Sequence, residues 1–202
     1  MELHGVIFDL DGTLFEADYD WPGIKRRLGM EDPRMAIMDY LKVLPPEERR
    51  AKERMLEEIE DQATAAGKLK PGVQELLQFL KAKGLKLALV TNNRRAVVER
   101  VLNRYGLNFD LVLTREVGVY KPSGEPLRLA LQRLGLESHE AVAVGDGEFD
   151  LRAAQEAGLP VIIVNPNIEA FQGRADHAVR DLFELRELFA QLLERQATEV
   201  PR

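Results

Sequence analysis

The sequence has no cysteine and only three histidines among its 202 residues. Without cysteine the chain has no disulfide framework and no thiolate metal site, so a reducing compartment is favoured and we expect a cytoplasmic protein. The histidines, His4, His139 and His177, show no ligand or catalytic-triad spacing. No apolar stretch approaches the ~20 residues of a membrane-spanning helix, so we expect no membrane partner.

An excess of basic residues is also missing. The formal net charge is −6, which provides no electrostatic reason to expect nucleic acid as a partner. The apolar share of 45% is that of an ordinary globular protein. These numbers leave the choice between a monomer and a homodimer open.

Short apolar runs that end in a polar residue recur along the chain. They are GVIFD at Asp9, LKLALVT at Thr91, FDLVLT at Thr114, AVAVGD at Asp146 and PVIIVN at Asn165. Near-continuous apolar runs are typical of strands buried on both faces, as in parallel sheets. Segments of helical period that end in glycine lie between several of them, for example VQELLQFLKAKG. This alternation predicts an α/β fold with a doubly wound parallel sheet.

Residues 16–70 interrupt the alternation. Trp21-Pro22 begins one short helical segment and Pro33 another, and a long helix follows from about residue 45. We expect this helix to be largely exposed, with a narrow apolar stripe of Ala51, Met55, Ile59 and Ala63. We therefore expect a core domain of residues 1–15 and 71–202, with a small α-helical cap of residues 16–70 inserted after the first strand.

Four carboxylates stand at or near predicted strand ends. Asp9 and Asp11 are two residues apart in extended chain, so both side chains can face one pocket. Asp146 follows a later strand, and Asp150 lies one helical turn beyond it. Because the carboxyl ends of parallel strands share one edge, these acids are predicted to converge there. Oxygen ligands without histidine or cysteine suit Mg²⁺.

A hydroxyl and a positive charge complement these acids. Thr91 ends the second long apolar run, and Lys121 precedes a proline. Together with backbone N–H groups at Asn92 and around Gly12, they could hold phosphate oxygens. A metal, a carboxylate nucleophile and a phosphate-binding site together indicate phosphoryl transfer.

The segments DLDGT, VTN, KP and GDGEFD, in that order, resemble the four motifs of the haloacid dehalogenase superfamily. The resemblance extends over nearly the whole chain. It implies a Rossmann-like core, and the helical insert resembles the cap of subclass I, with a phosphoglycolate-phosphatase-like pattern. Asp11 favours phosphate chemistry, since the dehalogenases lack an acid at that position. Gly147 departs from the commonest last motif, in which a small hydroxyl residue often stands there.

The resemblance also implies a role for each motif residue. Asp9 would attack phosphorus and become an aspartyl-phosphate. Asp11 would protonate the leaving oxygen and then activate water. Thr91 would hold a phosphoryl oxygen, and Lys121 would neutralise the phosphoryl charge and orient Asp9. This division requires the pKa values of the two acids to be tuned apart.

The metal site follows from the same resemblance. Asp9, Asp146 and the main-chain carbonyl of Asp11 would bind Mg²⁺, with Asp150 in the outer shell or as a further ligand. The expected partner is a small phosphorylated metabolite, and phosphoglycolate, sugar phosphates and nucleoside monophosphates stay equally open.

Two alternatives remain from the sequence. The first is a phosphomutase or phosphotransferase of the same fold, although Thr13-Leu14-Phe15 resembles the phosphatase members more closely. The second is a non-catalytic phosphate-binding regulatory module, against which every charged motif position is present.

Overall fold

Six parallel strands form the sheet on which the predicted site residues are arranged. The structure is a computed structural model that describes residues 2–32 and 34–199. The strand order is β5-β4-β1-β6-β7-β8. The strands are β1 (Gly5–Phe8), β4 (Lys86–Val90), β5 (Leu111–Leu113), β6 (Ala141–Gly145), β7 (Val161–Val164) and β8 (His177–Val179).

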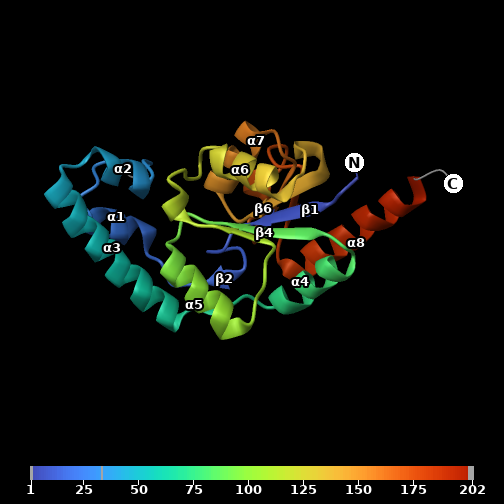
Figure 1. The fold of residues 1–202 in the computed structure, drawn as a ribbon, viewed down its shortest axis with the longest axis horizontal. Coiled ribbons are helices and arrows are strands. Elements are labelled where there is room, and N and C mark those ends of the chain that lie inside the picture. The colour runs from blue at the N-terminus through green and yellow to red at the C-terminus, as the bar shows by residue number, and fades with distance from the viewer. Residues whose placement is uncertain (1, 33, 200–202) are drawn as a thin grey trace. The chain divides into compact units, whose positions relative to one another are not determined.

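Helices cover both faces of this sheet (Figure 1). On one face α6 and α7 pack against the strands, and α4, α5 and α8 lie on the other. Their bounds are α4 (Val73–Ala82), α5 (Arg95–Tyr105), α6 (Glu125–Leu134), α7 (Glu148–Ala157) and α8 (Leu182–Glu199). Burial on both faces explains the near-continuous apolar strands, since neither face has contact with water. The predicted doubly wound α/β fold is confirmed.

One strand of this sheet was not predicted. β8 has only three residues, and the first of them, His177, is exposed. Only Ala178 and Val179 are apolar, so this strand leaves no apolar run in the sequence. It pairs with β7 in parallel and completes one edge of the sheet.

The chain divides into two compact units. One consists of Met1–Phe15 with Leu69–Arg202, and the other is Glu16–Lys68. The smaller unit holds α1 (Trp21–Arg27), α2 (Ile37–Val43) and α3 (Pro46–Ala66). The chain passes between the units through the short paired strands β2 (Phe15–Glu16) and β3 (Lys68–Leu69). The helical insertion after the first strand is thus present.

The insert has its own apolar core, built from Ile24, Leu28, Met30, Leu41 and Leu56. The predicted stripe on α3 is confirmed in part, because Met55 and Ile59 are half-buried against this core. The fully buried positions lie one residue further along the helix. Leu56, Glu60 and Thr64 are the buried residues of this helix, whereas Ala51 is exposed. Two of the three are polar, so an apolar pattern pointed to the neighbouring face.

The second helix of the insert begins later than its proline suggested. Pro33 lies outside the described residues, and α2 starts at Ile37. Among the described residues, no helix combines the length and apolarity that crossing a membrane requires.

The three central strands present their carboxyl ends side by side. β1 pairs in parallel with β4 on one side and β6 on the other. Asp9 follows β1 directly, Thr91 follows β4 and Asp146 follows β6. The backbone N–H of Asp9 donates to the carbonyl of Val144, 2.9 Å away. The sheet therefore brings these residues to one edge.

Candidate active site

A buried lysine lies between two carboxylates at this edge. Nζ of Lys121 is 2.6 Å from Oδ1 of Asp9 and 2.6 Å from Oδ1 of Asp150. Only 5% of the Lys121 side chain and 10% of each carboxylate side chain are exposed. Apolar side chains, including Ile7 and Leu127, line the space beside the three charged groups. Charge-assisted hydrogen bonds in such a setting hold all three groups in one arrangement.

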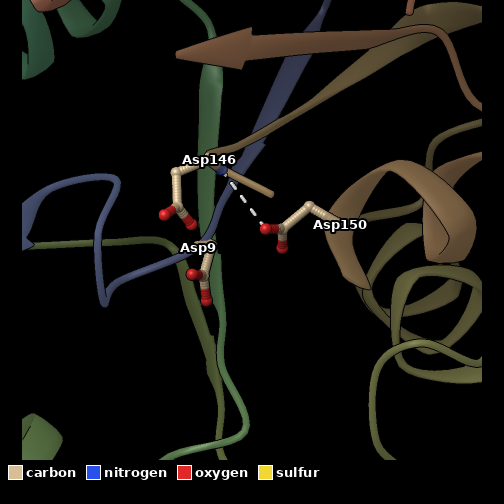
Figure 2. Close-up of side chains that lie close together, drawn as sticks. All are labelled: Asp9, Asp146 and Asp150. Atoms are coloured by element: carbon tan, nitrogen blue, oxygen red, sulfur yellow. Dashed lines mark hydrogen bonds between the residues drawn. The ribbon is translucent and has the colours of Figure 1, made fainter. Parts of the chain in front are cut away.

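Asp146 completes an acidic cluster with this pair (Figure 2). One oxygen each of Asp9, Asp146 and Asp150 lies within 4.8 Å of the others. Asp150 reaches back from the first turn of α7, where its Oδ2 accepts from the backbone N–H groups of Asp146 at 3.3 Å and Gly147 at 3.4 Å. The turn after β6 and the start of α7 are thus tied together.

The electrostatics of the cluster favour a cation. Burial raises the pKa of Asp9 well above its usual value; Lys121 opposes this, while Asp150, Asp11 and Asp146 add to it. Burial and then Asp150 raise the pKa of Asp146 to about 6. One lysine does not balance these acids, and a cation held among them would lower their pKa values. An all-oxygen donor set fits a hard divalent ion.

The Asp11 carboxylate is held by an asparagine. Nδ2 of Asn93 donates to Oδ2 of Asp11 at 3.0 Å. The backbone N–H of Asn93 donates to Oγ1 of Thr91 at 3.1 Å. Burial raises the pKa of Asp11 to about 6, against the hydrogen bonds of Asn93 and Thr91. A carboxyl with this pKa can both donate and accept a proton near neutral pH.

Asn93 was not among the predicted site residues. Its position directly after Thr91-Asn92, at a strand end of a parallel sheet, was the one available signal. It is 95% buried and connects two residues that the sequence did place in the site.

The side chain of Asn92 bonds to the backbone of Lys121. Its Nδ2 donates to the carbonyl of Lys121 at 2.7 Å, and its Oδ1 accepts from the Lys121 backbone N–H at 2.9 Å. The Asn92 side chain thus fixes the backbone that carries the buried lysine. Substrate binding by the Asn92 backbone stays a prediction.

Two glycines allow the acids to approach this closely. Gly12 has φ +79°, and a Cβ there would lie 2.2 Å from Oδ2 of Asp146. A Cβ on Gly145 would lie 2.2 Å from Cβ and Cγ of Asp150. Any larger residue at either position would displace a carboxylate of the cluster.

The chain is similar to known hydrolases over most of its length. Residues 3–158 match the haloacid dehalogenase-like hydrolase family. The chain is 32% identical to the pyrophosphatase PpaX of Halalkalibacterium halodurans over 185 residues, which covers 81% of this chain and 84% of that one. It is 39% identical to a phosphoglycolate phosphatase of Cupriavidus necator over 101 residues, 48% of this chain and 44% of that one.

A solved structure matches the fold. The crystal structure of a hydrolase from Pseudomonas syringae superposes with a TM-score of 0.79 at 20% identity, covering 93% of this chain and 98% of that chain. At this identity the agreement concerns the fold, including the sheet whose strand ends carry the acidic cluster.

Proposed function

Because the chain belongs to the haloacid dehalogenase-like hydrolase family, we propose that it is a Mg²⁺-dependent phosphatase that hydrolyses a small phosphomonoester. The observation that carries the proposal is the buried Lys121 ammonium, 2.6 Å from Asp9 and 2.6 Å from Asp150 beside the third acid, Asp146. This arrangement combines a fixed nucleophile with positive charge at the place where phosphoryl oxygens would bind.

In the first step an oxygen of Asp9 attacks phosphorus. The bond from phosphorus to the leaving oxygen breaks, and Asp11 donates its proton to that oxygen. The products are the free alcohol and an aspartyl-phosphate on Asp9. The raised pKa of Asp11, about 6, supports its role as the proton donor of this step.

In the second step water attacks the same phosphorus. Asp11, now ionised, takes a proton from the water, and the bond between Asp9 and phosphorus breaks to release inorganic phosphate. Because Lys121 pairs with Oδ1 of Asp9, the carboxylate is held in one rotation throughout both steps. Thr91 would donate its hydroxyl to a phosphoryl oxygen.

Asp9 and Asp146 would hold the metal through carboxylate oxygens, and Asp11 would do so through its main-chain carbonyl. The Asp150 carboxylate already accepts hydrogen bonds from Lys121 and from two backbone N–H groups. These bonds suit a residue that supports the metal ligands from beside them. Bound Mg²⁺ would supply positive charge to the phosphoryl oxygens in the transition state.

The substrate is proposed at the level of a class. The two relatives above act, by their names, on pyrophosphate and on phosphoglycolate, which are both small and phosphorylated. A small phosphorylated metabolite is therefore the partner that we propose for this chain.

The test is phosphate release from p-nitrophenyl phosphate with Mg²⁺ and with EDTA, followed by a panel that includes phosphoglycolate and pyrophosphate. D9N should abolish Mg²⁺-dependent release. D39N, which removes an exposed carboxylate of α2, should leave it unchanged. Mass spectrometry of acid-quenched enzyme should find one phosphoryl group on the peptide that contains Asp9. Turnover that persists in D9N would refute the proposal.

A further inference from the structure

An asparagine at the end of β7 contacts the turn that carries Asp146. Asn165 follows β7 directly, and its Nδ2 donates to the main-chain carbonyl of Asp146 at 2.8 Å. Its Oδ1 accepts from the backbone N–H of Asn167 at 2.9 Å. Its own backbone N–H donates to the carbonyl of Val179 in the neighbouring strand, also at 2.9 Å. Both ends of the side-chain amide are therefore in use.

The hydrogen bond from Asn165 to Asp146 lies just beyond the last backbone pair of β6 and β7. The registered pairing of β6 with β7 stops at Gly145 and Ile163, so the carbonyl of Asp146 lies beyond the ladder. A carbonyl in this place needs a donor from elsewhere. Asn165 supplies that donor from a side chain, at the residue whose carboxylate belongs to the acidic cluster.

The same turn is held at two other points. Oδ2 of Asp150 accepts from the backbone N–H groups of Asp146 and Gly147. Arg174 pairs with both oxygens of Glu148, at 2.8 and 2.7 Å. About half of each of the latter two side chains is exposed, and exposed ion pairs contribute little. The hydrogen bond from the Asn165 side chain is partly buried, so it restrains the turn more effectively than the Arg174–Glu148 ion pair does.

We propose that Asn165 is a positioning residue for the metal ligand Asp146: its amide fixes the backbone from which the carboxylate projects. The inference rests on the Mg²⁺ site proposed above. Mg²⁺ demands near-ideal octahedral geometry at about 2.0–2.1 Å, so small displacements of a ligand weaken binding. Gly12 lies against one side of the Asp146 carboxylate and limits its movement in that direction. The hydrogen bond from Asn165 to the Asp146 carbonyl then limits the movement of the backbone that carries this carboxylate.

The test compares two variants with the same change of charge. N165D keeps an acceptor for the Asn167 N–H but places a carboxylate oxygen against the Asp146 carbonyl in place of the donor. N167D adds the same charge two residues away on an exposed side chain that forms no cap bond to the next helix. Any general effect of charge on cation binding should therefore be measured by N167D.

Binding of Mg²⁺ to the substrate-free protein is measured by calorimetry. We expect the Mg²⁺ dissociation constant of N165D to exceed that of N167D about tenfold or more, as is typical for loss of a partner of a metal ligand. The Mg²⁺ concentration for half-maximal phosphate release should rise by the same factor, while KM at saturating Mg²⁺ should not change. A merely structural role would not separate these readouts.

Equal dissociation constants for N165D and N167D, with the parent binding Mg²⁺ normally, would overturn the inference alone. A parent protein that binds no Mg²⁺ would overturn the proposed metal site and the inference with it. Should N165D fail to fold, N165A removes the same donor without adding charge. Its Mg²⁺ dissociation constant is then compared with that of the parent, and equal values would overturn the inference.

Discussion

Replacing Lys121 by methionine tests the electrostatics of the site most directly. The change removes one positive charge, keeps most of the side-chain volume and leaves two buried carboxylates without their 2.6 Å partner. Burial alone would lower the pKa of Lys121, but Asp150 and Asp9 outweigh burial and raise it. The lysine is thus fully charged in the folded protein. Without it, the repulsion between the Asp9 and Asp150 carboxylates is no longer offset by this positive charge.

The expected size follows from this burial. Removal of one partner of a buried ion pair costs about 3–5 kcal/mol of unfolding free energy, because the remaining charge is desolvated and unpaired. We expect K121M to lose this amount in EDTA at pH 8. K42M is the matched control: Lys42 pairs with Asp39 at 3.8 Å on an exposed surface, so its loss should cost less than about 1 kcal/mol.

The penalty should also depend on pH in a definite direction. The pKa of Asp9 is already raised in the folded state, and loss of Lys121 raises it further. A carboxyl of this kind binds more protons folded than unfolded, so it destabilises the protein above its folded pKa and less as the pH falls towards 3.8, its unfolded value. The K121M penalty should therefore shrink between pH 8 and pH 5.

Urea unfolding of the parent, K121M and K42M at both pH values provides the measurement. D9N/K121M should recover part of the stability at pH 8, because it removes one of the two unpaired charges. A K121M penalty equal to that of K42M, or one that is the same at pH 8 and pH 5, would show that Lys121 does not neutralise buried acids.

Two further predictions concern positions around the site. G12A should lower kcat/KM on the order of a hundredfold, since its Cβ would displace the Asp146 carboxylate. Gly84 has a similar φ of +80°, but no atom lies within 4 Å of a Cβ placed there. G84A should therefore lower the stability while its activity equals that of the parent. E116A should lose about 1 kcal/mol at pH 7, because Glu116 accepts the first backbone N–H of α5 at Arg95. Partial burial would raise the pKa of Glu116, but Thr114 and the Arg95 N–H outweigh it and lower the pKa below 4.5. The E116A deficit should therefore be full above pH 4.5 and vanish as the pH falls through the folded pKa; a deficit independent of pH in urea unfolding would refute this role.

Much of the fold could be predicted from the sequence for a physical reason. A strand buried on both faces must be apolar at every position, which sets it apart from the helices around it. Five of the strands of the central sheet contain such an apolar run, and among them only Lys86 at the start of β4 is exposed. β8 has just two apolar residues after the exposed His177, so it leaves no run to recognise. On α3 the buried positions include Glu60 and Thr64, which an apolar pattern cannot find.

The doubly wound α/β fold follows from the sequence alone. So does the edge at which Asp9, Thr91 and Asp146 meet, because parallel strands end on one side. The hydrogen-bond and ion-pair partners of the side chains at that edge are visible only in the folded structure. Lys121 reaches Asp150 across 29 positions, and Asn93 reaches Asp11 across 82. Hydrogen bonds of this kind depend on how the loops after each strand place the side chains. Distances of about 3 Å are not encoded in any local pattern of residues.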